Sequence, residues 1–239
     1  MALKGRIAII TGASGGVGYA TARLFARQGA VVVAVARDRD RLEWLVGEIA
    51  AEGLQGVSLP TDVTDPVQVQ RMVDQTMRLL GRIDVLINGV GAVLKLAPLE
   101  QFADADWNYI IQTNLTSIFY TTRAVIPHMK NQHSGTILNI GARIGKQGIA
   151  NFAPLCAAKF GITGLSQALA QELRPYNIFV TTVFAGMINP DIHPLNPVEG
   201  FRRQPLSADD VAQAILWACT LPPSLRVDEL PLMPRQLDM

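Results

Sequence analysis

Two scarcities in this sequence exclude several classes of protein. There are only two cysteines, Cys156 and Cys219, and they lack the spacing of metal ligands. A disulfide framework and a metal site are therefore not expected, and a reducing compartment fits. The charges nearly cancel, with 21 basic and 20 acidic residues and a net charge of +1. Nothing in that balance favours binding to nucleic acid or to an acidic membrane surface.

Long hydrophobic runs are also absent. The opening segment Met1–Arg6 is short and polar, and Ile7–Ile10 is too brief for the apolar part of a signal peptide. No run reaches the length of a membrane-spanning helix. We therefore expect a cytoplasmic protein with no nucleic-acid, membrane or metal partner.

The sequence does contain a regular alternation of two kinds of segment over its 239 residues, of which 49% are hydrophobic. β-branched apolar runs predict strands at Arg6–Ile10, Val31–Val35, Gly56–Leu59, Val85–Asn88, Gly135–Ile140, Ile178–Phe184 and Asp228–Pro231. Intervening segments with helix-start signals or amphipathic patterns predict helices at Gly16–Gln28, Arg39–Ala51, Pro66–Leu80, Asp104–Met129, Ala153–Leu173 and Ser207–Leu221. This order predicts one α/β domain over residues 1–239, built on a doubly wound parallel sheet of about seven strands with helices on both faces. The proline-rich stretch Asn189–Pro205 predicts a flexible substrate flap around residues 187–206.

The glycines between the first strand and the first helix form the most informative motif, Thr11-Gly12-Ala13-Ser14-Gly15-Gly16-Val17-Gly18. Glycines allow a tight turn and let backbone N–H groups approach a pyrophosphate, and the helix N-terminus offers further donors to that anion. A glycine turn between a strand and a helix is the dinucleotide-binding arrangement of Rossmann-type folds. The motif therefore predicts a dinucleotide beyond the carboxyl ends of the strands.

The same loop, with the spacing Thr11-Gly12-x-x-x-Gly16-x-Gly18, resembles the cofactor loop of the short-chain dehydrogenases/reductases. Further segments that resemble the family's motifs are Asp62-Val63, Ile87-Asn88-Gly89-Val90-Gly91, Thr113-Asn114-Leu115-Thr116, Cys156-Ala157-Ala158-Lys159-Phe160-Gly161 and Ala185-Gly186-Met187-Ile188-Asn189. The chain is identified as a member on all of them jointly. The resemblance implies cofactor contacts at Gly12, Ser14, Gly16, Val17, Gly18, Asp62, Val63, Asn88, Gly89, Lys159, Gly186 and Ile188. The charge of Arg37 adds it to this set as a contact for the nucleotide phosphate.

The end of the second predicted strand indicates which nucleotide is bound. NAD-selective chains place an acidic residue there for the ribose hydroxyls, whereas this chain has Ala36 followed by Arg37. A guanidinium suits a 2′-phosphate, so NADP(H) is favoured over NAD(H). Asp38 is the counter-argument, because its carboxylate can also be aimed at the ribose.

The resemblance implies a catalytic tyrosine four residues before Lys159, a serine thirteen residues before that tyrosine, and the asparagine Asn114. In this chain the two positions hold Leu155 and Ala142, whose side chains carry no hydrogen-bonding group. Asn114 and Lys159 thus remain as candidate catalytic residues without the usual acid–base pair. Two other groups remain open as substitutes: Cys156, next along the helix, and His193, in the flap.

These observations favour an NADP(H)-dependent oxidoreductase that reduces an already activated substrate. The alternatives are a non-redox enzyme (an isomerase, dehydratase or cyclase) on the same scaffold, or a non-catalytic nucleotide-responsive binding or scaffold protein. The apolar pair Ala142 and Leu155 predicts a small apolar organic ligand. The helices Asp104–Met129 and Ala153–Leu173 resemble those through which family subunits pair, and the second carries the apolar stripe Phe160, Leu165 and Leu169, so we expect a homodimer or homotetramer.

Overall fold

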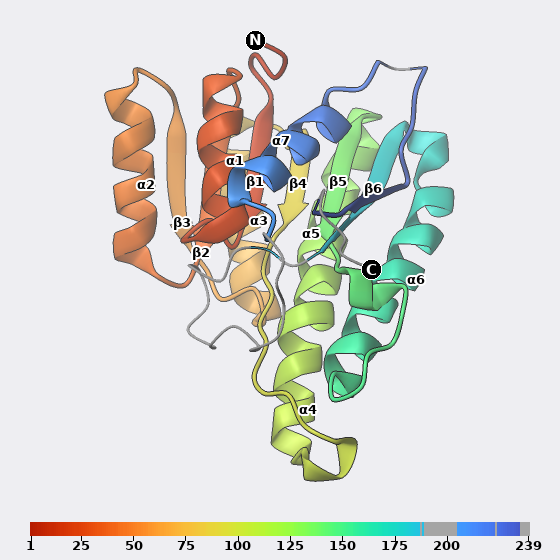
Figure 1. Cartoon of the computed structure of the whole chain (residues 1–239). Coiled ribbons are helices and arrows are strands. Elements are labelled where there is room, and N and C mark those ends of the chain that lie inside the picture. Colours follow the sequence, from red (N-terminus) through yellow and green to blue (C-terminus); the bar gives the residue numbers. More distant parts are fainter. Residues whose placement is uncertain (187, 189–204, 223, 235–239) are drawn as a thin grey trace.

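Seven parallel strands form the centre of the computed structural model, which describes residues 1–186, 188, 205–222 and 224–234 (Figure 1). The strands are β1 (Ile7–Thr11), β2 (Val31–Ala36), β3 (Gly56–Pro60), β4 (Val85–Asn88), β5 (Gly135–Ile140), β6 (Ile178–Ala185) and β7 (Glu229–Leu232). They lie in the order β3-β2-β1-β4-β5-β6-β7. The predicted doubly wound sheet is confirmed, with strand boundaries shifted by one residue at several ends.

Helices cover both faces of this sheet. They are α1 (Gly16–Arg27), α2 (Arg39–Ala51), α3 (Pro66–Leu80), α4 (Asp104–Ile111), α5 (Ser117–Gln132), α6 (Ala153–Glu172) and α7 (Ala208–Cys219), with short 3₁₀ turns at Leu99–Gln101, Arg143–Gly145 and Arg174–Tyr176. Alternate strand residues reach two separate cores, because successive side chains point to opposite faces. Ala8 and Ile10 of β1 pack with α1, α2 and α7, whereas Ile7 and Ile9 pack with α3, α5 and α6.

Capping side chains fix where two of the helices begin, as the sequence predicts. The carboxylate of Asp65 accepts hydrogen bonds from the backbone N–H groups of Val67 and Gln68 at 2.8 and 3.3 Å, and Pro66 occupies the first turn of α3. At α7, Ser207 and Asp210 form a reciprocal capping box.

The helix predicted over Asp104–Met129 is wrong as one regular element. A π-helical segment, Gln112–Thr116, separates α4 from α5. Hydroxyl and amide side chains provide the physical reason, because they offer backbone groups alternative partners. Asn114 Nδ2 donates to the Ile110 carbonyl at 3.0 Å, and Ser117 Oγ donates to the Thr113 carbonyl at 2.7 Å.

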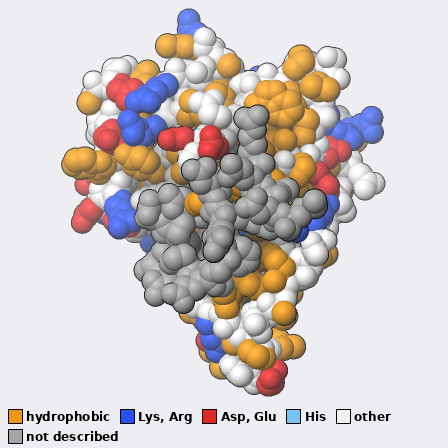
Figure 2. Space-filling view, in the orientation of Figure 1, with side chains coloured by type: hydrophobic (Ala, Val, Ile, Leu, Met, Phe, Trp, Pro, Cys, Tyr) orange, Lys and Arg blue, Asp and Glu red, His pale blue; other side chains and the backbone are white. Residues whose placement is uncertain are grey.

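The predicted flap can be compared with the structure only in part, and the predicted apolar stripe of α6 in full. Most of the predicted flap, residues 187 and 189–204, lies outside the described residues. Ile188 is described and forms a parallel bridge with Leu206. In the predicted apolar stripe of α6, Leu169 is buried and Leu165 packs against the core, so only Phe160 faces outward, 45% exposed. Figure 2 shows hydrophobic side chains gathered at the lower end of the molecule, where α4 and the preceding segment lie in Figure 1.

Candidate active site

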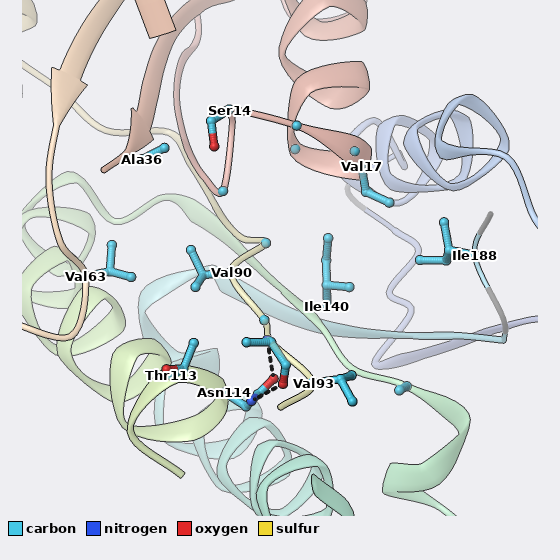
Figure 3. A pocket seen from close by; sticks show the side chains of 18 of the residues that line it. Ser14, Val17, Ala36, Val63, Val90, Val93, Thr113, Asn114, Ile140 and Ile188 are labelled. Carbon is cyan, nitrogen blue, oxygen red and sulfur yellow. Dashed lines mark hydrogen bonds between the residues drawn. The ribbon is translucent and has the colours of Figure 1, made fainter. Parts of the chain in front are cut away.

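The site lies where the strand order reverses, between β1 and β4. Thr11 of β1 stands opposite Asn88 of β4, and its Oγ1 accepts a hydrogen bond from the Gly89 N–H at 3.0 Å and donates to the Ile87 carbonyl at 3.2 Å. Crevices at such switch points hold ligands in open α/β sheets. Here the crevice opens into a cavity of about 540 Å³, part of which Figure 3 shows.

The glycine loop lines one end of the cavity, and at Gly12 and Gly18 the surrounding backbone leaves no space for a side chain. A Cβ added at Gly18 would lie 2.2 Å from the Gly12 carbonyl oxygen, and one added at Gly12 would lie 2.9 Å from the Gly89 carbonyl oxygen. Gly12 also has a φ of 75°, in the left-handed region. The backbone is therefore packed into the cradle that a pyrophosphate requires, at the start of α1.

The structure brings most of the predicted cofactor residues together around this cavity. Those that line it are Gly12, Ser14, Gly16, Val17, Gly18, Arg37, Asp62, Val63, Gly89, Lys159, Gly186 and Ile188. Asn88 is the exception, because its side chain is buried behind the cavity. Asn88 Nδ2 donates to Thr122 Oγ1 at 3.1 Å and to Asn139 Oδ1 at 2.8 Å. Its amide joins β4 to α5 and β5 and does not line the cavity.

Two guanidinium groups border the end of the cavity beyond β2. Arg37 was expected there, but Arg41 was not, and both line the cavity. Asp38 caps α2: its Oδ1 accepts a hydrogen bond from the Arg41 N–H at 3.1 Å, and its Oδ2 lies 3.4 Å from Arg41 Nε. The carboxylate thus already has partners within the helix start. An N-cap aspartate followed three residues later by arginine was the sequence signal for this arrangement.

Lys159 lies at the opposite end of the cavity, on α6. Its side chain is buried, with 7% exposure, and Nζ donates to the Ile140 carbonyl at 3.1 Å. Burial lowers the pKa of Lys159 from 10.5 to about 8, because an ammonium group loses its hydration there. Gly91 approaches it closely, since a Cβ added there would lie 3.6 Å from Lys159 Nζ.

The side chain of Asn114 is fully engaged with the loop after β4. Its Oδ1 accepts a hydrogen bond from the Ala92 N–H at 3.2 Å, and its Nδ2 donates to the Ala92 carbonyl at 2.9 Å. Figure 3 draws these bonds beside Val93. Asn114 therefore fixes the loop that forms one wall of the cavity, and it does so from the π-helical segment.

Comparisons with known proteins agree with this geometry. The sequence profile described as short chain dehydrogenase matches residues 6–196. The chain belongs to the short chain dehydrogenase family. It is 36% identical over 227 residues to the 3-oxoacyl-[acyl-carrier-protein] reductase FabG of Thermotoga maritima, covering 91% of each chain. It is 30% identical to an uncharacterized oxidoreductase of Staphylococcus aureus, covering 97% of this chain and 98% of the relative.

Solved structures of related proteins share the fold along almost the whole chain. A metagenomic short-chain oxidoreductase in complex with NADP superposes with a TM-score of 0.87 at 30% identity, covering 99% of this chain and 100% of the other. An NAD⁺-bound xylitol dehydrogenase superposes with a TM-score of 0.88 at 24% identity, covering 96% and 98%. The second shows a shared fold only.

At the positions where the resemblance implies a serine and a tyrosine, this short chain dehydrogenase has Ala142 and Leu155, and both line the cavity. Of the two candidate substitutes, Cys156 is buried and is not among the described lining residues, and His193 lies outside the described residues. Tyr109 does line the cavity, which was not foreseen. Its spacing of four before Thr113, another lining residue, was the available signal.

Within the described part of the chain, no three His, Cys, Asp or Glu side chains are grouped as metal ligands. Among the described helices, none has both the length and the apolar character needed to cross a membrane.

Proposed function

We propose that this short chain dehydrogenase binds NADP(H) and reduces an activated apolar carbonyl or conjugated compound without the family's usual serine and tyrosine. One observation carries the proposal. Ala142 and Leu155, which have hydrocarbon side chains, share a cavity with Lys159 and the glycine cradle. Residues suited to holding a nucleotide thus surround the cavity, while the two expected positions carry no proton-handling group.

The choice of nucleotide follows from charge. Arg37 and Arg41 both line the end of the cavity beyond β2, where guanidinium groups make paired, charge-assisted hydrogen bonds to a phosphate. Asp38 would favour ribose hydroxyls instead, but its two carboxylate oxygens already contact Arg41. The NADP complex of the related metagenomic enzyme supports the same choice.

The residues present fit such a cofactor. At Gly12 and Gly18 there is no space for a side chain, so backbone atoms alone form the surface that a pyrophosphate would contact. When bound, the nicotinamide supplies a hydride to the substrate. Lys159 would hold the nicotinamide ribose, and Asn114 holds the wall of the cavity through Ala92. The Thermotoga relative is a reductase by name, which supports the direction of the reaction.

An apolar substrate matches the rest of the cavity. Beyond Val93, which lines it, the chain exposes the leucines Leu94, Leu96 and Leu99, by 39, 41 and 57%. Hydrocarbon side chains thus occur inside the cavity, at Ala142 and Leu155, and on the surface segment that follows its wall. A substrate that accepts hydride readily, such as a conjugated enone, needs less help from a general acid.

The cofactor claim is tested by calorimetric titration of the protein with NADPH and with NADH. NADPH is expected to bind more tightly. Arg37→Asp should weaken NADPH binding by about 1.5–3 kcal/mol, the range for hydrogen bonds to charged groups. Arg39→Asp is the matched control, because Arg39 is exposed at the start of α2 and pairs with Glu43 at 3.7 Å, and it is not among the described lining residues. Equal affinities, or tighter binding of NADH, would show the proposal to be wrong.

The catalytic claim is tested by following NADPH absorbance with a panel of simple ketones, α-dicarbonyls and enones. Turnover is expected only with the activated compounds. Rapid reduction of a simple ketone by the unmodified chain would mean that another group supplies the proton. Binding of NADPH without turnover of any compound would favour a non-redox enzyme or a nucleotide-responsive binding protein.

We also propose that two copies pair through α5 and α6. Phe119 on α5 is 41% exposed and Phe160 on α6 is 45% exposed, and the Arg123 guanidinium covers Phe119 at 4.7 Å from the ring centroid. Light scattering should give a dimer or tetramer. A 25.9 kDa species at micromolar concentration would refute the pairing.

A further inference from the structure

We propose that Lys159 is also a nucleophile: its amine condenses with apolar aldehydes and ketones that enter the cavity, and forms an imine. The proposal adds a second activity to the cavity and does not depend on hydride transfer. Its substrate class is a carbonyl compound with a hydrocarbon substituent and no charge.

The surroundings of Nζ leave the amine available. Its hydrogen-bond partner among the described residues is the Ile140 carbonyl oxygen at 3.1 Å, so two of its hydrogens have no protein acceptor there. No described carboxylate forms an ion pair with it. An amine with a carboxylate partner stays protonated, whereas this one lies in a cavity of about 540 Å³ without such a partner.

The adjoining elements bring few ionisable groups to this end of the cavity. The 3₁₀ turn after β5 carries Arg143, which is exposed and bonded to Gln147. Helix α4 carries the phenol of Tyr109, and α6 itself carries the buried thiol of Cys156. The β4 loop contributes the unsubstituted Gly91, and the π-helical segment contributes the neutral amide of Asn114. None of these side chains is a carboxylate.

Burial then decides the protonation state. It lowers the pKa of the Lys159 ammonium to about 8, so a large share of the amine is neutral at pH 8, compared with well under a hundredth for a lysine of ordinary pKa near 10.4. A desolvated lysine in an apolar pocket is one of the recognised forms of activated nucleophile.

The condensation balances without an oxidant or reductant. The lone pair of Nζ forms a bond to the carbonyl carbon while the carbonyl π electrons move to oxygen, and a proton passes from nitrogen to that oxygen. The nitrogen lone pair of the carbinolamine then forms the second C–N bond as the C–O bond breaks, and the remaining N–H proton passes through solvent to the departing hydroxide, which leaves as water. The products are one imine and one water.

The walls set which carbonyl compounds enter. Leu155 lies one turn before Lys159 on α6, and Ala142 and Val93 line the same cavity. These side chains favour an alkyl aldehyde such as hexanal, while the desolvation cost of a carboxylate disfavours the anionic aldehyde glyoxylate.

The experiment treats the full chain at pH 8 with hexanal and cyanoborohydride, which fixes any imine as a secondary amine, and then measures modification at each lysine by peptide mass spectrometry. Lys159 should be modified at least about tenfold faster than the exposed Lys4 and Lys146. Glyoxylate should show no such preference. Equal or slower modification of Lys159 by hexanal would overturn the proposal.

Two variants test the reason for the reactivity. Leu155→Glu places a carboxylate four residues before Lys159 on one helix face, which should slow modification of Lys159 at pH 8 and leave Lys4 unchanged. Leu155→Gln is the matched neutral control, because it gives the wall a polar side chain of the same size without the charge, and it should slow modification of Lys159 less than Leu155→Glu does. If both variants slow the reaction equally, the absence of a counter-ion is not its cause and the proposal is refuted.

The proposed function is distinguished from this inference by adding NADPH. Saturating NADPH should protect Lys159, because the proposed function places the nicotinamide ribose on its amine. NADPH that binds by calorimetry without protecting Lys159 would contradict the role of Lys159 in the proposed function and leave the imine chemistry intact. Binding of NADPH together with an unreactive Lys159 would overturn only the present inference.

Discussion

The buried ammonium of Lys159 should make the stability of this protein depend on pH in a specific way. Folding lowers the pKa of this group from 10.5 to about 8, so the folded chain binds the proton less tightly than the unfolded chain. Between pH 8 and 10.5 the unfolded state therefore holds more protons, and the free energy of unfolding rises with pH over that window. Below pH 8 the full penalty is present. At about 1.4 kcal/mol per tenfold change in proton affinity, it amounts to about 3 kcal/mol.

Lys159→Met removes the charge and keeps an unbranched apolar stem. The lost hydrogen bond to the Ile140 carbonyl offsets part of the gain, by about 1–3 kcal/mol, so the stability at a single pH does not decide the question. The pH dependence decides it. As the pH rises from 7 to 10.5, the free energy of unfolding of the unmodified chain should increase by about 3 kcal/mol relative to that of the variant.

The assay is urea unfolding followed by tryptophan fluorescence, from pH 7 to 10.5, at one protein concentration. Lys146→Met is the control, because Lys146 is exposed on the surface and pairs with Glu229 at 2.6 Å, and its difference from the unmodified chain should change far less. A difference for Lys159→Met that stays flat across this window would refute the reasoning, since Lys159 would then titrate alike in both states.

Three other changes test separate parts of the molecule. Leu155→Tyr combined with Ala142→Ser restores the two groups that the family resemblance implies. It should raise reduction of simple ketones by about 10²-fold or more, measured by NADPH absorbance, and by more than either single change; no gain would mean that the cavity does not hold a carbonyl in the family's pose. Asp65→Ala removes the cap of α3 and should lower the free energy of unfolding by about 1 kcal/mol, measured in urea, whereas an unchanged midpoint would deny the cap an energetic role. Phe160→Glu should dissociate the proposed pair of subunits in light scattering, and an unaltered mass would place the interface elsewhere.

The fold was predictable because its signals are local and repeated. Most strands contain several β-branched residues, and the helices after Asp65 and Ser207 begin at capping residues that the structure confirms. The interruption at Gln112–Thr116 was not predictable from hydrophobic periodicity. It depends on which backbone carbonyls the side chains of Asn114 and Ser117 reach, and a π-helical turn alters the phase of the pattern by only a fraction of a turn.

The site was predictable to the extent that backbone geometry dictates it. The glycine loop and Lys159 take their places in the cavity as expected. The side chain of Asn88 does not line the cavity. At the end of a strand it can point toward the cavity or into the core, and its hydrogen bonds to Thr122 and Asn139 hold it in the core. Arg41 was missed although the sequence carried a signal for it, the N-cap Asp38 three residues earlier, and the start of α2 places it beside the cavity.

The two halves of this site differ in what a substitution costs the fold. At Gly18 any added Cβ collides with the Gly12 carbonyl oxygen, so a change there disturbs the backbone that shapes the phosphate cradle. Ala142 has extended backbone angles of −156° and 161°, which any residue adopts, and Leu155 sits in a regular turn of α6 with its side chain in the cavity. Neither position requires an unusual backbone conformation. Under the proposed function, hydrocarbon side chains stand in place of the proton-handling groups while the glycine loop keeps its shape, and the chemistry of the cavity depends on the other described lining residues, among which Lys159 is the most buried cation.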